Sequence, residues 1–419
     1  MSTILTATIT RVEINKAALR HNLKIFREVV GSKVIIGACV KANAYGHGLV
    51  ETAKILRENG ADWLCVNALF EAEALRKAGV SSPIYIMGYV MKTDLPEVIN
   101  LDCRLIVYNK ETVTELAQAA KKLNKTARIH IKVETGNNRQ GVFLDELLDF
   151  AMHAKQFKNI EIEGLATHFA NIEDITPKTS MDAPASGGSN RLGSAMAGHP
   201  PELASPRLGL QEIALYPQYQ AANFKAAIEL LEKHGIRIPI RHLANSAATL
   251  LFPKTHYEMV RPGIAIYGLW PSPKTKKLCE EMHGGADLQP VLSWKTRVAQ
   301  IKEIPQNSYV GYGCIFKTSR KTRLAILPVG YYDGYDRGFS NKSHVLIHGK
   351  AAKVCGRICM NIMMVDITDI PEVKVEDTAT LLGKDGSAEI TADFLGELIG
   401  TINYEITTRI SESIPRIVV

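Results

Sequence analysis

The sequence predicts an α/β fold in which an N-terminal TIM (β/α)8 barrel precedes a C-terminal domain made mainly of β-strands. Three observations support this prediction. Strand-like and helix-like segments alternate over the first two thirds of the chain, and short strands separated by glycine-bearing turns follow. The length of 419 residues suits a barrel with a smaller second domain. We expect the barrel at residues 1–282 and the β domain at 283–419.

The barrel strands are predicted where short apolar runs occur between polar or glycine-bearing segments. They are residues 7–14, 34–40, 62–66, 84–87, 104–107, 128–133, 160–167, 240–243 and 264–267. Segments with helical spacing of apolar residues lie between them, at 16–30, 49–59, 68–78, near Leu95, 112–123, 144–155 and 224–234. Asn15 is expected to cap the first helix. About eight such units close a parallel barrel.

Two segments interrupt the pattern. Residues 177–217 are rich in Pro, Gly, Ser and Ala and have little periodicity, so we interpret them as a flexible insertion. An active-site lid is the alternative, which the lack of regularly spaced aromatic or charged residues disfavours. Residues 271–290 contain three prolines, together with Gly284 and Gly285, and are expected to link the two domains.

The C-terminal part has the pattern of an all-β domain with one helix. Its strands are predicted at 291–301, 324–327, 344–347, 352–354, 363–366 and 378–382, and its helix at 392–399.

Composition limits the kind of protein. A net charge of +7 over this length gives little reason to expect nucleic acid as a partner. Seven scattered cysteines do not form a disulfide framework and suggest a reducing, cytoplasmic setting. No apolar run is long enough to span a bilayer, so we expect a soluble protein without membrane association. Metal binding is not expected: His344 with His348, and Cys355 with Cys359, are better interpreted as ordinary strand residues.

Lys41 lies where a buried strand ends, and this position can make its amine reactive. A lysine at such an exit is poorly hydrated, so its neutral amine is accessible and can form a Schiff base. The turn Tyr45-Gly46-His47-Gly48 follows, with glycines that let the backbone approach a ligand and a phenol that can donate to an anion. The alternative is an ordinary strand with a surface lysine and a tight turn.

In a barrel, working residues lie just past the C-terminal ends of the strands. This rule selects a set that combines an amine, two guanidinium groups, an imidazole and possible phosphate-binding groups: Lys41, Arg139, His168, Asn245, Ser246, Arg261 and Gly263. The set has no pair of carboxylates, which argues against a glycosidase. Each residue alone could equally be a barrel-rim side chain without a catalytic role.

The string VKANAYGHG, residues 40–48, resembles the cofactor-lysine motif of the alanine racemases, which carry pyridoxal phosphate. The resemblance extends over most of the chain except the insertion. It implies that Lys41 holds the cofactor and that Tyr45, Ser246, Gly263 and Ile264 hold its phosphate. It also implies that His168 packs against the pyridine ring beside Asn245, and that Arg261 faces the ring nitrogen.

Arg261 has a chemical consequence in that position. A guanidinium keeps its proton, so the pyridine nitrogen stays unprotonated and the ring is a weaker electron sink. Rapid reprotonation of the α-carbon then favours racemisation over transamination.

The β domain carries two further family-like motifs, around Tyr312 and Tyr331. Racemisation needs acid/base groups on opposite faces of a planar intermediate, and by resemblance these are Lys41 and Tyr312. The family takes Tyr312 and the Cys359-Met360 segment from a partner subunit, which implies a homodimer with shared active sites. Arg139 and Met360 match positions that contact the substrate carboxylate.

Three departures from the family pattern stand out. Asn361 replaces the usual aspartate after Cys-Met, and the segment 134–139 before the barrel arginine is altered. Glu412 falls where many members have a phosphate-binding tyrosine, so we expect it to point away or to widen the entrance. Lys132 matches a lysine that can be carbamylated.

The resulting hypothesis is a pyridoxal-phosphate-dependent racemase that interconverts L- and D-alanine, by family implication for bacterial peptidoglycan. Glu412 motivates one alternative, a racemase of wider scope that acts on serine or basic amino acids. A non-catalytic pyridoxal-phosphate-binding protein is another, which the β domain with Tyr312 and Met360 disfavours. A decarboxylase is a third, which Arg261 disfavours because decarboxylation benefits from a strong electron sink.

Overall fold

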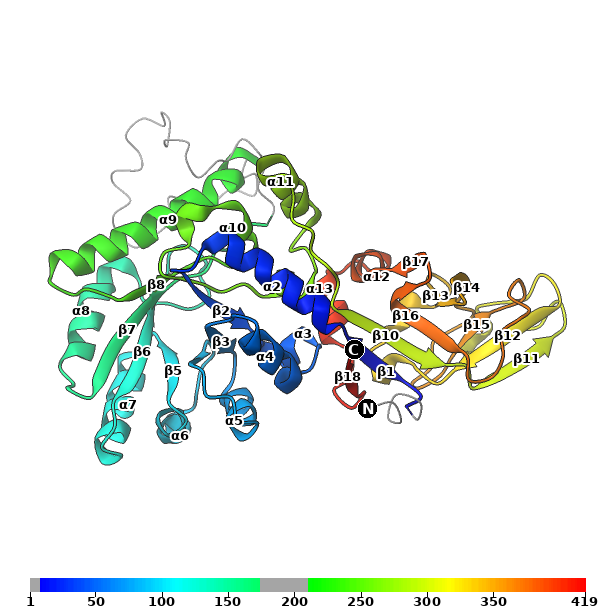
Figure 1. Cartoon of the computed structure of the whole chain (residues 1–419), viewed down its shortest axis with the longest axis horizontal. Coiled ribbons are helices and arrows are strands. Elements are labelled where there is room, and N and C mark those ends of the chain that lie inside the picture. Colours follow the sequence, from blue (N-terminus) through cyan, green and yellow to red (C-terminus); the bar gives the residue numbers. More distant parts are fainter. Residues whose placement is uncertain (1–7, 174–209) are drawn as a thin grey trace.

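The computed structural model describes residues 8–173 and 210–419. Residues 177–209 of the predicted insertion therefore lie outside the described residues. The described chain forms a barrel and a β domain, at the left and right of Figure 1.

Eight parallel strands form the barrel sheet in the order β8-β7-β6-β5-β4-β3-β2-β9. They are β2 (Ile35–Cys39), β3 (Trp63–Val66), β4 (Ile84–Ile86), β5 (Cys103–Val107), β6 (Ala127–Lys132), β7 (Ile160–Ala166), β8 (Ile240–His242) and β9 (Met259–Val260). The ends of the sheet meet, because the N–H of Glu258 donates to Arg241 O (3.3 Å) and that of Arg261 donates to Ala244 O (2.9 Å). The predicted barrel is confirmed as a near-closed one.

Helices surround this sheet (Figure 1). The α-helices are α2 (Lys16–Val30), α3 (Lys41–Tyr45), α4 (Leu49–Glu58), α5 (Leu69–Lys77), α6 (Leu95–Asn100), α7 (Lys110–Lys122), α8 (Leu144–Lys155), α9 (Leu210–Lys233), α10 (Ser246–Leu251) and α11 (Pro273–His283). Short 3-10 turns are η1 (Lys92–Asp94), η2 (Pro253–Thr255) and η3 (Ile264–Tyr267). Asn15 caps α2 as predicted, because its Oδ1 accepts from the N–H of Ala18 at 3.0 Å.

Two predicted barrel strands are wrong. The described part of segment 7–14 contains β1 (Arg11–Ile14), which pairs with strands of the β domain and not with the barrel. Residues 264–267 form η3, and the eighth barrel strand is the shorter β9. Pro262 and Gly263 end β9, so the buried apolar run after them continues as a turn closed by Gly268 in the left-handed region.

Two helices replace predicted irregular segments. Residues 210–217 belong to α9, which contains Pro217 and begins well before the expected residue 224. Within the predicted linker 271–290, residues Pro273–His283 form α11. Ser272 caps it by accepting from Thr275 N (3.0 Å), Pro273 occupies its first turn and Gly284 closes it. The prolines and glycines there delimit a helix because proline suits the first turn and glycine the C-terminus.

The β domain contains two sheets. The larger has the order β14-β13-β16-β10-β1-β18, with β17 on β16, and the smaller is β11-β12-β15. The strands are β10 (Leu292–Arg297), β11 (Gln300–Ile304), β12 (Thr322–Leu327), β13 (His344–Ile347), β14 (Lys350–Lys353), β15 (Met363–Asp366), β16 (Thr378–Asp385), β17 (Ala388–Ile390) and β18 (Arg416–Val418). The helical elements are η4 (Tyr312–Cys314), η5 (Tyr331–Asp333), η6 (Arg337–Phe339), α12 (Ala392–Ile399) and α13 (Asn403–Thr408). The strand predicted at 291–301 is two strands, because the chain passes between the sheets there.

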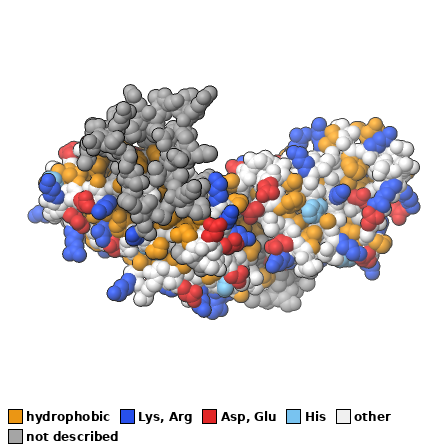
Figure 2. Space-filling view, turned by 90° about the horizontal axis from the view of Figure 1, so that it is seen from above, with side chains coloured by type: hydrophobic (Ala, Val, Ile, Leu, Met, Phe, Trp, Pro, Cys, Tyr) orange, Lys and Arg blue, Asp and Glu red, His pale blue; other side chains and the backbone are white. Residues whose placement is uncertain are grey.

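The two parts share one hydrophobic core. A single cluster of buried side chains extends from barrel residues such as Ile36 to Trp294 and Tyr335 in the β domain. Figure 2 shows acidic and basic side chains interspersed over the described part of one face, which agrees with the small net charge. None of the described helices has the length and apolar character that crossing a bilayer requires.

Candidate active site

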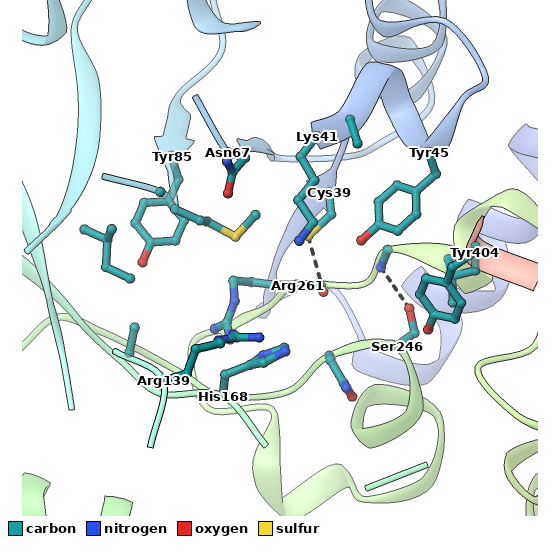
Figure 3. Close-up of a pocket in the computed structure, with 18 of the residues that line it drawn as sticks. Cys39, Lys41, Tyr45, Asn67, Tyr85, Arg139, His168, Ser246, Arg261 and Tyr404 are labelled. Atoms are coloured by element: carbon teal, nitrogen blue, oxygen red, sulfur yellow. Dashed lines mark hydrogen bonds between the residues drawn. The ribbon is translucent and has the colours of Figure 1, made fainter. Parts of the chain in front are cut away.

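A cavity of about 690 Å³ opens at the C-terminal ends of the barrel strands. We call it the barrel cavity. It brings together all nine site residues that the sequence analysis selected in the barrel: Lys41, Tyr45, Arg139, His168, Asn245, Ser246, Arg261, Gly263 and Ile264. Figure 3 shows Lys41 and Tyr45 reaching into it from one side and Arg261, Arg139 and His168 from the other. Their shared position is established, and their individual roles stay predictions.

Lys41 begins α3, which is a left-handed turn directly after β2 and not a right-handed α-helix. The four residues that follow it, Ala42 to Tyr45, all have φ near +53°, between 52° and 54°, in the left-handed region that non-glycine residues rarely occupy. Two side-chain hydrogen bonds stabilise it: Glu71 Oε1 accepts from Ala42 N (2.6 Å), and Asn43 Oδ1, within the turn, accepts from Leu49 N (2.8 Å). Backbone strain of this kind persists where the surroundings enforce it, often at functional sites. Here it directs Lys41 and Tyr45 into one cavity.

Opposite this turn lies a group of donors suited to an anion. Ser246 Oγ accepts from the N–H groups of Gly263 (2.8 Å) and Ala265 (3.4 Å), which leaves its own O–H to donate. Burial raises the pKa of the Tyr45 phenol, so that it stays protonated and remains a donor. A Cβ on residue 263 would lie 2.4 Å from the Tyr45 hydroxyl, so only glycine lets the two segments approach. Asn245 caps α10 by accepting from Ala248 N (3.0 Å).

Arg261 is a buried cation in the cavity wall, only 6% exposed. Its Nη1 donates to Nδ1 of His242, and its Nη2 donates to the carbonyls of Thr167 (2.7 Å) and Leu243 (3.5 Å). These contacts hold the guanidinium plane in one orientation.

Further basic groups gather beside Arg261. Burial, with Arg261 and Arg139 nearby, lowers the pKa of Lys132 well below its ordinary value. Burial also lowers the pKa of His168, and the Lys132 amine adds to this effect. His168 is therefore neutral at pH 7. An anionic group would be favoured here because the guanidinium groups of Arg261 and Arg139 converge on the cavity.

Helix α9 holds the two loops that carry Arg139 and His168. Gln220, fully buried, donates to His168 O (3.2 Å) and accepts from Ala170 N (2.8 Å). Asn223 donates to Thr135 O (3.1 Å), and Tyr216 donates to Gly136 O (2.6 Å). These side chains recur at helical spacing, so α9 presents one polar stripe to both loops.

Tyr404 and Thr408 of α13 also line the barrel cavity, and the sequence analysis missed them. The Tyr404 ring lies 6.1 Å from that of Tyr45, and burial raises its pKa. Glu412, which the resemblance aligns with a phosphate-binding tyrosine, is exposed and is not among the residues that line the cavity. The expectation that it points away is therefore confirmed. The alternative of a wider substrate range is motivated by an anionic side chain at the entrance, and Glu412 does not line the cavity.

Tyr312 and Met360 lie in a second cavity, of about 560 Å³, which we call the β-domain cavity. Its lining also includes Tyr331, Arg357, Cys359 and Asn361. Tyr312 is 72% exposed and Met360 is 54% exposed. Within one chain the structure does not bring these two residues to Lys41.

The sequence and the fold match known proteins. Family models described as the alanine racemase N-terminal and C-terminal domains match residues 14–271 and 291–418. The alanine racemase of Methanococcus maripaludis is 40% identical over 407 residues, which is 97% of each chain.

Two solved structures extend the comparison. The alanine racemase from Bacillus anthracis with bound L-Ala-P has a TM-score of 0.84 and 32% identity, covering 98% of this chain and 95% of that chain. The complex of Clostridium difficile 630 alanine racemase with cycloserine has a TM-score of 0.82 and 30% identity, covering 98% and 96%. Since domain models, sequence relatives and solved structures agree over nearly the full length, this chain belongs to the alanine racemase family.

Proposed function

We propose that the protein is a pyridoxal-phosphate-dependent racemase that interconverts L-alanine and D-alanine. Its family consists of amino-acid isomerases. The observation that carries the proposal is the barrel cavity, which combines an amine, an anion-binding group of donors and a buried guanidinium within about 690 Å³.

The residues of the cavity fit this cofactor. Lys41 supplies the amine that would hold its aldehyde carbon. Tyr45 and Ser246 supply hydroxyl donors for a phosphate, and the Gly263–Ile264 segment, whose Gly263 N–H holds Ser246 Oγ, is proposed to lie against that phosphate. The close approach of Gly263 to the Tyr45 hydroxyl leaves these donors on one side of the cavity. His168 and Asn245 are proposed to lie against the ring. Arg261 is proposed to face the ring nitrogen.

Pyridoxal phosphate, when bound, supplies an electron sink that makes the α-hydrogen of an attached amino acid acidic. Arg261 donates to the ring nitrogen in our proposal and cannot give up its proton, which limits the strength of that sink. Its fixed hydrogen bonds to His242 and Thr167 keep it in this orientation. The α-carbon is then reprotonated before side reactions occur.

Two groups exchange the α-proton. Lys41 Nζ takes it from the D-enantiomer, and the Tyr312 hydroxyl of a second copy of the chain takes it from the L-enantiomer. A second copy is proposed because Tyr312 is largely exposed and lies in a cavity separate from that of Lys41. Arg139, with Met360 of the second copy, is proposed to bind the substrate carboxylate.

The names of the related structures favour a small amino-acid substrate. The Bacillus anthracis protein is described with bound L-Ala-P and the Clostridium difficile protein with cycloserine. Alanine therefore fits better than serine or lysine. The family resemblance further leads us to propose a cytoplasmic enzyme that supplies D-alanine for peptidoglycan.

The test uses purified protein supplied with pyridoxal phosphate. We expect a visible absorbance band, retention of the cofactor on Lys41 after borohydride reduction, and loss of optical rotation with L-alanine. Bound cofactor without racemisation of alanine, serine or lysine would instead support a binding protein. Absence of cofactor on Lys41 would overturn the proposal.

A further inference from the structure

A chain of hydrogen bonds crosses the barrel interior beneath the cavity. It runs from Arg261 through His242 and His130 to Glu163. Nδ1 of His130 lies 2.7 Å from Nε2 of His242, and Nε2 of His130 lies 3.2 Å from Glu163 Oε2. Arg104 completes it, because its Nε donates to Glu163 Oε2 at 3.2 Å. Both histidines are fully buried.

The direction of this chain follows from its ends. Arg261 can only donate, so Nδ1 of His242 must be unprotonated and accept. The proton of the neutral His242 ring is then on Nε2 and is donated to Nδ1 of His130. His130 in turn carries its proton on Nε2 and donates it to the carboxylate of Glu163. All of these hydrogen bonds can form together only when both histidine rings carry their proton on Nε2.

The charges of the groups agree with this assignment. Burial lowers the pKa of both histidines, with Arg261 contributing for His242, so both rings are neutral at pH 7. Burial alone would raise the pKa of Glu163, but the hydrogen bond from His130 and the Arg104 guanidinium bring it below its ordinary value. Glu163 is thus an ionised acceptor at the end of the hydrogen-bond chain opposite Arg261.

The local sequence explains how Glu163 enters the barrel. Strands β6 and β7 pair Ile129 with Ile162 but His130 with Gly164, so Glu163 is an extra residue on β7. Such a bulge redirects a side chain from its expected face. A Cβ on residue 164 would lie 2.2 Å from Nδ1 of His130, so glycine makes room for the ring.

We propose that Glu163 is a positioning residue: acting through His130, it fixes the tautomer of His242 that accepts a hydrogen bond from Arg261. This inference rests on the proposed function, in which Arg261 faces the ring nitrogen of the cofactor. Without the carboxylate, His130 and His242 can both carry the proton on Nδ1. The N–H of His242 then faces the guanidinium, and Arg261 loses its fixed orientation.

The tautomers of the two histidines can be determined by NMR in the absence of cofactor and of turnover. Full-length protein labelled with ¹⁵N-histidine is compared by NMR as wild type, Glu163→Met and Glu163→Gln, with ring signals assigned through His130→Phe and His242→Phe. We expect Nε2–H tautomers in the wild type and in Glu163→Gln, whose amide oxygen still accepts. Glu163→Met should show the Nδ1–H form as well. An unchanged wild-type pattern in Glu163→Met overturns the proposal.

Kinetics of the cofactor-loaded enzyme give the second readout. Glu163→Met should lower kcat roughly 10- to 100-fold with a much smaller change in KM, the scale typical of groups that orient a catalytic residue. It should also form more pyridoxamine phosphate per racemisation event, whereas Glu163→Gln should restore both values. Gly164→Ala, which displaces the His130 ring but keeps the carboxylate, should match Glu163→Met.

Glu161→Met is the matched control. Glu161 lies on the same strand with a 50% exposed side chain that pairs with Arg128 at 3.2 Å, outside the barrel interior. We expect wild-type tautomers and rates. A wild type that takes up no cofactor would contradict the proposed function and leave the tautomer result intact. A racemising wild type with an equally active Glu163→Met would contradict this inference alone.

Discussion

At the scale of single residues, the candidate site depends on close approaches that few side chains permit. Gly263 brings the segment after β9 against the Tyr45 hydroxyl, where a Cβ would lie 2.4 Å from oxygen. Its N–H is held by Ser246 Oγ at 2.8 Å. The group of donors therefore needs glycine at this position and a hydroxyl at 246, whatever anion it binds.

Replacing Gly263 with alanine should weaken cofactor binding. The added methyl group collides with Tyr45 and pushes apart two of the proposed phosphate-binding segments, so we expect affinity for pyridoxal phosphate to fall roughly 10-fold or more. Titration of the absorbance band with added cofactor measures this. Gly386→Ala, at a position where a Cβ meets nothing within 4 Å, should retain wild-type affinity. Equal affinities of the two variants would contradict the prediction.

At the scale of an element, the left-handed turn after Lys41 is stabilised by the side chain of His47. This ring is fully buried and packs 4.4 Å from that of Tyr267. Its Nδ1 donates to Ala44 O (3.0 Å) and Tyr45 O (3.1 Å). Burial lowers the pKa of His47 from 6.5 to about 4, so the native state holds the neutral ring.

This lowered pKa makes the stability of the fold depend on pH. Below pH 6.5 the unfolded chain binds a proton that the folded chain rejects, so the contribution of His47 is present above that pH and is lost as pH falls toward 4. Between pH 7 and 5 this amounts to about 2 kcal/mol.

Urea unfolding of the wild type and His47→Asn at both pH values measures the effect. Asparagine can donate to the same carbonyls but does not titrate, so the variant should lose less stability on acidification. The exposed His234→Asn variant should behave as the wild type. Parallel losses in the wild type and His47→Asn would rule out this role for His47.

At the scale of the whole molecule, each part completes the other. Strand β1 leaves the N-terminal part and pairs between β10 and β18, whereas α13 of the C-terminal part places Tyr404 and Thr408 in the barrel cavity. The active site proposed here is therefore not a property of the barrel alone. The exposed Tyr312 and Met360 extend this reasoning to a second copy of the chain.

Sharing of sites between copies can be tested by complementation. Lys41→Ala and Tyr312→Phe homodimers should each be inactive or nearly so, whereas co-expression should restore about a quarter of wild-type racemisation, because half of the dimers are mixed and each has one intact site. Co-expression of Lys41→Ala with Arg139→Ala is the control: both residues lie on the same chain's cavity, so their mixed dimers contain no intact site. Lack of recovery in the first pair would contradict the shared-site proposal.

Much of this architecture follows from local pattern in the sequence. The apolar periodicity of α2 and α8 and the runs of β13 and β15 predict those elements at their observed bounds. The rule that barrel residues act at strand ends selected seven residues that the structure places in one cavity, and the family resemblance added Tyr45 and Ile264. These features depend on neighbouring residues and on the regular geometry of one fold class, so the sequence by itself determines them.

Tertiary contacts decided the rest. The apolar run of η3 satisfies a strand pattern, yet Pro262 and Gly263 end pairing before it. Nothing local to residues 403–408 indicates that Tyr404 packs against Tyr45, since they are far apart in sequence. The hydrogen-bond chain from Arg261 to Glu163 joins the residue after β9 to β8, β6 and β7 and depends on one bulge. Such contacts arise from long-range packing, which no window of sequence contains.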